Sequence, residues 1–125
     1  MSNVEQFPVI DQNVLDELLS IMEDEYIDIL HIYLEDSLSL MNDIHSGFNN
    51  YHEQILLPVH TLKSSSKNVG ARRLAAVAQK MEILVKEKNY EAAALMLDEL
   101  QDTFAEAHGT ISEIVKKGST LSKAL

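Results

Sequence analysis

The sequence predicts an all-α protein: an up-down-up-down antiparallel four-helix bundle with a short additional N-terminal helix. Apolar residues recur at three- and four-residue steps along most of the chain, as in helices with one buried face. No segment of useful length alternates apolar and polar residues as a half-buried strand does. The connections between the predicted helices are only a few residues long, which favours antiparallel neighbours.

The first helix is expected to follow an N-terminal lead-in at residues 1–10. Asp11 is a candidate N-cap, because its side chain can accept a hydrogen bond from a backbone N–H of the first turn. The apolar residues that follow at helical spacing are Val14, Leu15, Leu18, Leu19 and Met22. This pattern predicts a short helix that ends near Met22.

The second helix is expected at about residues 24–46, after an acidic cluster that suits a helix N-terminus. Its apolar stripe consists of Ile27, Leu30, Leu34, Leu38, Met41 and Ile44. Gly47 and the pair Asn49 and Asn50 are predicted to end it.

The third helix is expected at about residues 51–68, and Pro58 interrupts its hydrogen-bond pattern. The sequence therefore predicts either a bend near Pro58 or a helix that effectively begins near Leu56. Gly70 is predicted to end this helix, because glycine readily adopts the left-handed backbone conformation of a C-cap.

Two further helices are predicted, at about residues 71–88 and 90–117, with Asn89 as the stop of one and the N-cap of the other. Residues 118–125 are expected to form a flexible tail. Residues 11–117 then make up a single helical domain, which agrees with the length of the chain.

Composition excludes several classes of function. The chain has no cysteine, so it has no disulfides, thiolate zinc sites or thiol nucleophiles. Residues 1–8 lack the basic and apolar regions of a secretory signal. No apolar run approaches the ~20 residues of a membrane span. We therefore expect a cytoplasmic protein without a membrane partner.

Basic residues are concentrated in one part of an acidic chain. The formal net charge of −10 argues against a nucleic-acid partner. From Gln54 to Met81 there is no Asp or Glu, although this segment holds five of the ten Lys and Arg residues. Such a distribution favours the steering of an anionic partner to this segment, with chance clustering as the alternative.

One face of the third helix carries an unusual set of side chains. At about 100° per residue, a histidine, two lysines, a serine and two leucines project to the same side, away from the predicted core. These residues are Leu56, Leu57, His60, Lys63, Ser64 and Lys67. A face of this composition indicates a functional surface.

The same segment resembles the histidine-phosphotransfer (HPt) family. The family pattern is His-x-Leu-Lys-Gly-Ser-[Ala/Ser]-x-x-Leu-Gly-Ala. Eight positions fit it, with Val69 as an apolar residue in place of the leucine: His60, Leu62, Lys63, Ser65, Ser66, Val69, Gly70 and Ala71. Ser64 stands where glycine is usual, which keeps the side chain small. The resemblance extends more loosely over about residues 10–112.

The resemblance implies that His60 accepts a phosphoryl group from an aspartyl phosphate on a receiver domain and passes it to another receiver. An imidazole nitrogen is a competent nucleophile near neutral pH. Lys63 would offset charge on the transferring phosphoryl group. Lys67 would either contact the acidic rim of a receiver or remain solvated.

The family often places Gln or Glu on the following helix to orient the imidazole. Glu82 falls at the matching position in this sequence, and Gln79, one turn earlier, is the alternative. Receiver docking would use Leu56 and Leu57, and the small Ser64 would leave room for the partner.

The implied partners are receiver domains of a hybrid sensor kinase and a response regulator. No cofactor is expected on this chain; Mg²⁺ would belong to the receiver, and the scattered histidines predict no metal site. A monomer is expected, although Leu56 and Leu57 could instead support self-association.

Two other functions compete with this one. In a histidine-kinase dimerisation fragment, the histidine is followed by an acidic residue and later by a proline, whereas Thr61 follows His60 in this sequence. The sequence also contains no Gly-rich nucleotide motif. A non-catalytic helical adaptor, in which His60 does nothing, is the other alternative.

Overall fold

The structure is a computed structural model that describes residues 3–50 and 54–124, with side chains described up to residue 118. This part of the chain contains six α-helices, two short 3₁₀ helices and no strand, so the prediction of an all-α protein is confirmed. The elements are η1 (Val4–Gln6), α1 (Gln12–Met22), η2 (Glu23–Glu25), α2 (Tyr26–Asn49), α3 (Leu56–Asn68), α4 (Arg72–Lys86), α5 (Tyr90–Ala94) and α6 (Leu97–Ala124).

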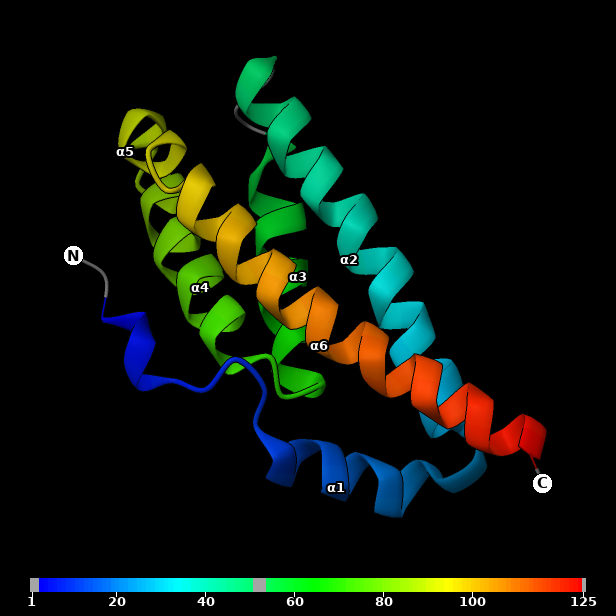
Figure 1. Cartoon of the computed structure of the whole chain (residues 1–125). Helices are drawn as coiled ribbons and strands as arrows, with labels where there is room; N and C mark the ends of the chain where they lie inside the picture. Colours follow the sequence, from blue (N-terminus) through cyan, green and yellow to red (C-terminus); the bar gives the residue numbers. More distant parts are fainter. Residues whose placement is uncertain (1–2, 51–53, 125) are drawn as a thin grey trace.

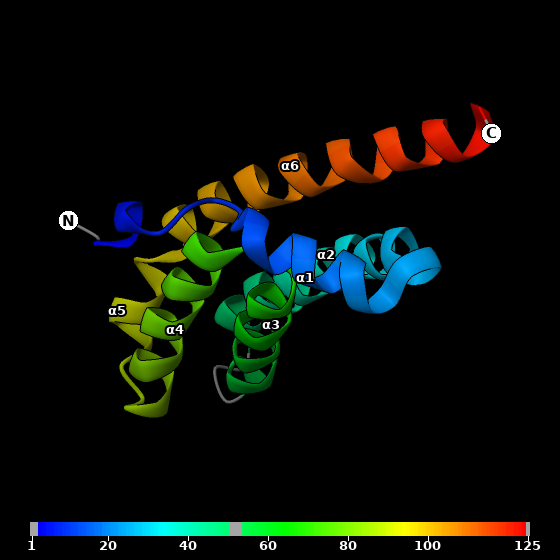
Figure 2. The same cartoon turned by 90° about the horizontal axis from the view of Figure 1, so that it is seen from below.

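The four long helices α2, α3, α4 and α6 form the bundle (Figure 1). α3 packs against both α2 and α4, and α6 packs against the same two helices and closes the ring. Helices that are neighbours in sequence are therefore neighbours in space, which is the up-down-up-down arrangement that the sequence predicts. The short helix α1 lies across one end of the bundle, beside the start of α2 and the end of α3 (Figures 1 and 2).

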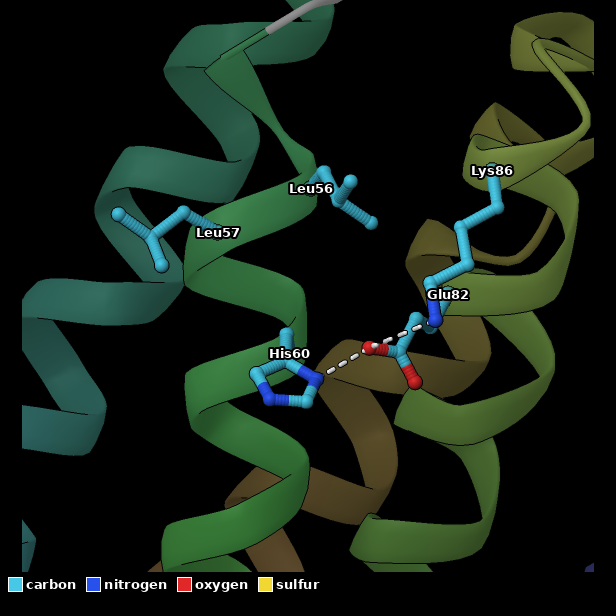
Figure 3. A pocket seen from close by; sticks show the side chains of 5 residues that line it. All are labelled: Leu56, Leu57, His60, Glu82 and Lys86. Carbon is cyan, nitrogen blue, oxygen red and sulfur yellow. Dashed lines mark hydrogen bonds and ion pairs between the residues drawn. The ribbon is translucent and has the colours of Figure 1, made fainter.

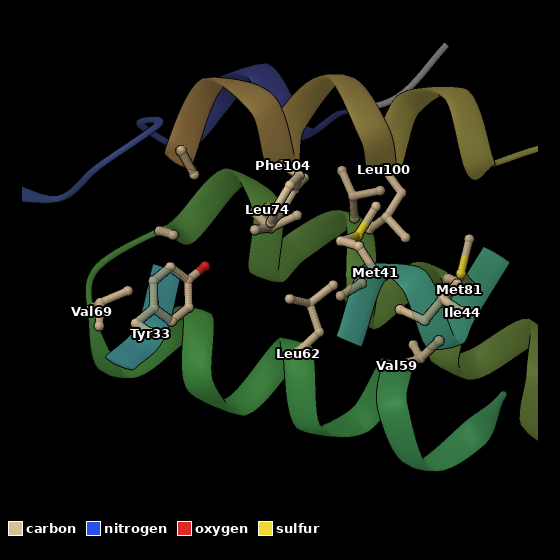
Figure 4. Close-up of a cluster of buried hydrophobic side chains, with 14 of the residues drawn as sticks. Tyr33, Met41, Ile44, Val59, Leu62, Val69, Leu74, Met81, Leu100 and Phe104 are labelled. Carbon is tan, nitrogen blue, oxygen red and sulfur yellow. The ribbon is translucent and has the colours of Figure 1, made fainter. Parts of the chain in front are cut away.

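The core is built from the apolar stripes of these four helices (Figure 4). Buried side chains from all four meet there, among them Met41, Ile44, Val59, Leu62, Leu74, Met81, Leu100 and Phe104. Each such side chain contributes about 1.5–3 kcal/mol relative to an exposed position. Because Val59 and Leu62 are buried on α3, His60 is held on the opposite, outer face of that helix.

α3 begins at Leu56, as one of the two alternatives for Pro58 predicts. Pro58 is the third residue of the helix, where a backbone N–H would have no partner inside the helix in any case. The proline therefore costs no helical hydrogen bond. The other predicted start, at residue 51, lies outside the described residues.

The end of α3 is fixed by Gly70. The N–H of Ala71 bonds to the carbonyl of Ser66 and the N–H of Gly70 to that of Lys67, which together form a Schellman motif. Gly70 has φ = +80°, and its carbonyl accepts the N–H of Asp11 at 2.7 Å. The Asp11 carboxylate in turn caps α1 through the N–H of Asn13, as predicted. The glycine thus joins the end of α3 to the start of α1.

The N-terminal segment is tied to the bundle rather than loose. Val4 is buried, and the Arg73 guanidinium donates hydrogen bonds to the backbone carbonyls of Phe7 and Glu5. The N–H of Arg73 also bonds to the carbonyl of Pro8. These contacts hold the described part of the lead-in against α4.

α2 and the C-terminal helices differ from the predicted boundaries. α2 continues through Gly47 to Asn49, so Gly47 does not end the helix as predicted. Glycine at this position instead allows the close approach of Ile55, because a Cβ at residue 47 would lie 2.7 Å from that side chain. The backbone of residues 118–124, within the predicted flexible tail, continues α6. Ile27 packs closely against Gly118 at this point.

The single helix predicted at about residues 90–117 is wrong, because this segment forms two helices. α5 ends at Ala94, and α6 starts at Leu97. Between them, the N–H of Met96 bonds to the carbonyl of Ala93, three residues back instead of four. α5 packs on α4, whereas α6 packs on both α4 and α2. Among the described residues, none of the helices has the length and apolar character needed to cross a membrane.

Gly70→Ala is expected to lower the free energy of unfolding by about 2 kcal/mol, because alanine is unfavourable in the left-handed region and its Cβ would lie 2.8 Å from the Asp11 carbonyl oxygen. Urea unfolding measures the change. Gly109→Ala is the control: its Cβ meets nothing within 4 Å, and alanine should stabilise that helical position by up to about 1 kcal/mol. Equal stability of the two variants would contradict this account of the α3 end.

Candidate functional site

His60 lies on the outer face of α3, beside α4. Its side chain is 53% exposed. The buried face of α3 packs against α2 and fixes the rotation of the helix. On this face Ser66 shares a hydrogen bond of 2.8 Å with Tyr33 of α2. Burial raises the pKa of Tyr33 to about 12, so its hydroxyl stays protonated and available for this bond. This bond joins α2 to α3 beneath the site.

Glu82 of α4 links His60 to Lys63 (Figure 3). One carboxylate oxygen, Oε2, lies 2.5 Å from His60 Nδ1, and the other, Oε1, accepts a hydrogen bond of 2.5 Å from Lys63 Nζ. The Glu82 side chain is only 4% exposed, so both bonds are needed to satisfy a buried carboxylate. This arrangement orients the imidazole and leaves its other nitrogen, Nε2, without a bond to Glu82.

The electrostatic surroundings keep Glu82 ionised. Burial by itself raises the pKa of this carboxyl, but hydrogen bonds from Lys63 and His60, together with the charges of Lys63 and Lys86, outweigh it. The net result is a pKa below the usual value for glutamate. An ionised carboxylate accepts hydrogen bonds and cannot donate them, so Nδ1 of His60 must carry the hydrogen. A neutral imidazole in this position therefore has its lone pair on Nε2.

A groove of about 460 Å³ opens beside the imidazole, between α3 and α4. Its lining consists of Leu56, Leu57, His60, Glu82 and Lys86. Leu56 points toward α4, whereas Leu57 points away from it and is 73% exposed (Figure 3). The two leucines predicted for docking therefore lie next to His60, with Leu57 open to a partner.

The other predicted residues are distributed around this centre. Ser64 is exposed on the same face of α3. Lys63 is 18% exposed, and its ammonium group is directed at Glu82. Lys67 and Gln79 are exposed and line a second groove, of about 240 Å³, together with Arg72. Of the two candidates for contact with His60, the structure brings Glu82 to the imidazole and places Gln79 in the second groove.

Two contacts were not anticipated from the sequence. Lys86 Nζ lies 3.9 Å from Glu82 Oε2, and the spacing of four residues on one helix is the signal that could have identified it. The other is the hydrogen bond between Ser66 and Tyr33 of α2, which lie 33 positions apart in the sequence. Ser65, by contrast, donates to carbonyls of the preceding turn of its own helix, those of Thr61 and Leu62.

The described residues hold no cluster of three or more His, Cys, Asp or Glu side chains that could bind a metal ion. The functional groups that the site brings together are the imidazole of His60, the carboxylate of Glu82 and the ammonium groups of Lys63 and Lys86. A nucleophilic nitrogen beside a buried carboxylate suits transfer of a group to nitrogen.

Comparison with known families agrees with this chemistry. The Hpt domain family model matches residues 28–110, which include His60, Lys63 and Glu82. The chain belongs to the Hpt domain family, whose members are phosphocarriers in histidine phosphotransfer and interact with receiver domains of phosphorelays. A comparison with curated protein sequences found no match.

Solved structures share the fold. Histidine-containing phosphotransfer protein B (HptB) from Pseudomonas aeruginosa PAO1 superimposes with a TM-score of 0.84 at 23% identity, over 88% of this chain and 96% of that chain. A rice protein provisionally described as a histidine-containing phosphotransfer protein superimposes with a TM-score of 0.78 at 14% identity, over 90% of this chain and 85% of that chain. At these identities the likeness concerns the fold.

Glu82→Gln is expected to lower the free energy of unfolding by about 1–2 kcal/mol near neutral pH, because Lys63 loses its charged partner. The pKa of Glu82 is lower in the folded protein than in the unfolded chain. Its contribution to stability is therefore complete above the ordinary glutamate pKa and is lost as the pH falls through the lower, folded-state pKa.

Urea unfolding at pH 7 and at about pH 3 measures this contribution. The difference in stability between wild type and Glu82→Gln should shrink in acid. Glu87→Gln, which removes an exposed carboxylate from the end of α4, serves as the control and should have little effect. A difference for Glu82→Gln that is equally large at both pH values would contradict the assignment.

Proposed function

We propose that Nε2 of His60 accepts a phosphoryl group from the aspartyl phosphate of one receiver domain and passes it to the aspartate of another. The observation that carries this proposal is the bond between His60 Nδ1 and Glu82, which leaves the Nε2 lone pair free on a side chain that is 53% exposed. The nucleophile is thus oriented before the partner arrives.

The neighbouring residues support the transfer in different ways. Lys63 places a positive charge one turn from His60, where it offsets charge on the incoming phosphoryl group while it also neutralises Glu82. The small side chain of Ser64 leaves space over the imidazole for the surface of a receiver. The exposed Leu57 and the adjacent Leu56 supply apolar contact area.

The proposed partners are a receiver of a hybrid sensor kinase and a receiver of a response regulator. The basic segment around His60, within a chain of net charge −10, supports the steering of an acidic receiver surface to this face, and Lys67 would contribute there. Mg²⁺ would be held by the receiver. In this proposal the chain acts as a monomer in the cytoplasm, with no ATP site of its own.

The two competing functions have less support. A kinase dimerisation fragment would need an acidic residue after its histidine, and Thr61 stands there. A non-catalytic adaptor would not require a free Nε2 on His60. It would also not require a buried carboxylate that orients the imidazole.

His60→Gln is expected to abolish phosphoryl transfer, because the amide has no nucleophilic lone pair on nitrogen. The measurement follows radiolabel from a phosphorylated receiver domain, with Mg²⁺, onto the purified chain. His31→Gln is the matched control, since His31 is exposed on α2 and pairs only with Glu35 among the described contacts. Equal labelling of the His60→Gln variant would exclude His60 as the acceptor.

Leu57→Glu is expected to weaken receiver binding by about tenfold or more, because it places a charge in the apolar contact beside His60. The Kd for a receiver and the rate of transfer at low receiver concentration measure this effect. Leu95→Glu alters a residue that is 83% exposed in the turn between α5 and α6, and it should leave both quantities unchanged. The same loss in both variants would refute a specific role for Leu57.

A further inference from the structure

The hydrogen-bond partners of His60 constrain the phosphorylated state as well as the free state. In the free protein, a neutral imidazole has one N–H, and the ionised Glu82 carboxylate requires that it be on Nδ1. Phosphorylation of Nε2, which the proposed function requires, removes the lone pair from that nitrogen. A neutral phosphorylated ring would then have a bare lone pair on Nδ1, facing Glu82.

This neutral form of the ring fits the site poorly. Nδ1 and Glu82 Oε2 are 2.5 Å apart, and without a hydrogen between them two acceptors would be in contact. The carboxylate is only 4% exposed, so water cannot easily replace the lost partner. A ring that keeps its proton instead donates a charge-assisted hydrogen bond to the carboxylate.

The charged groups around the ring do not remove its preference for a protonated Nδ1. Among the described residues, the charged groups that face the ring are Glu82 and Lys86 from α4 and Lys63 from α3. Lys63 binds Oε1 and leaves Oε2 to the ring. Lys86 lies 3.9 Å from Oε2, but its side chain is 59% exposed, so solvent screens its charge.

We propose that Glu82 holds a proton on Nδ1 of the phosphorylated His60 ring, so that the phosphoryl group arrives and leaves without any proton transfer. On arrival, the Nε2 lone pair forms the N–P bond, the P–O bond of the aspartyl phosphate breaks, and its electron pair goes to the receiver carboxylate. On departure, a carboxylate oxygen of the second receiver bonds to phosphorus, and the N–P electron pair returns to Nε2. The proton stays on Nδ1 throughout.

Glu82 is therefore a positioning residue that also sets the quality of the leaving group. A protonated ring leaves as neutral imidazole, whereas an unprotonated ring would have to leave as an imidazolate anion. The phosphoryl group on this protein should consequently be transferred and hydrolysed readily at neutral and mildly alkaline pH.

The test uses the full chain, phosphorylated with potassium phosphoramidate. The His60→Gln variant is treated in the same way and gives the signal of phosphate bound to the other histidines. After removal of the donor, ³¹P NMR follows the loss of bound phosphate between about pH 5 and pH 10. In Glu82→Gln the amide can turn to donate its N–H to a bare Nδ1. The midpoint of the hydrolysis profile should therefore lie about one pH unit or more lower in this variant, with hydrolysis about tenfold slower at pH 8.

Glu87→Gln makes the same change of charge at the C-cap of α4, outside the groove, and should follow the wild-type profile. A second measurement needs no variant: ¹⁵N NMR of the phosphorylated wild-type ring should detect a protonated Nδ1 at pH 8. A merely structural role of Glu82 would change neither the pH midpoint nor the Nδ1 signal.

The outcomes separate the two proposals. Coincident pH profiles for wild type and Glu82→Gln, or an unprotonated Nδ1 in phosphorylated wild type at pH 8, would overturn the inference about Glu82 and leave His60 as the acceptor. Labelling of His60→Gln equal to that of wild type would overturn both, because no phosphate would then reside on His60.

Discussion

The buried carboxylate of Glu82 is the interaction on which the site depends. A carboxylate that is 4% exposed must be fully hydrogen-bonded, and its two oxygens find partners only because His60 and Lys63 lie one turn apart on the facing helix. The same two bonds orient the imidazole and attach α3 to α4 at mid-length. Under the proposed function, stability and reactivity therefore depend on the same atoms, and a change to Glu82 should affect both.

The rest of the bundle keeps this pair of helices in register. The apolar face of α3 is buried against α2 and α4, and the bond between Ser66 and Tyr33 fixes its rotation from the inner side. The Schellman motif at Gly70 ends α3, and the Gly70 carbonyl accepts a hydrogen bond from Asp11 at the start of α1. Arg73 binds the N-terminal segment to α4. Each of these contacts is distant from the Nε2 atom, yet together they determine which face of α3 presents His60 to a partner.

The sequence predicts much of this structure because most of its determinants are local. Helical periodicity, the Asp11 cap and the left-handed Gly70 each depend on neighbouring residues, and the pattern around His60 belongs to a family of known fold. The break between α5 and α6 has no glycine or proline to mark it. On either side of it the helices have different neighbours, since α5 packs on α4 whereas α6 packs on both α4 and α2, and such contacts between distant segments are not visible in the local sequence. The bond between Ser66 and Tyr33 joins residues 33 positions apart, so only the packed fold reveals it.

In the proposed mechanism, Glu82 occupies Nδ1 of His60 and thereby assigns the phosphoryl group to Nε2. The most direct measurement is ¹⁵N and ³¹P NMR of the phosphorylated protein, which identifies the ring nitrogen that is bonded to phosphorus. The structure predicts phosphorus on Nε2 and a hydrogen-bonded Nδ1. A bond between phosphorus and Nδ1 would contradict the account, because it would require the contact between His60 and Glu82 to be broken before transfer.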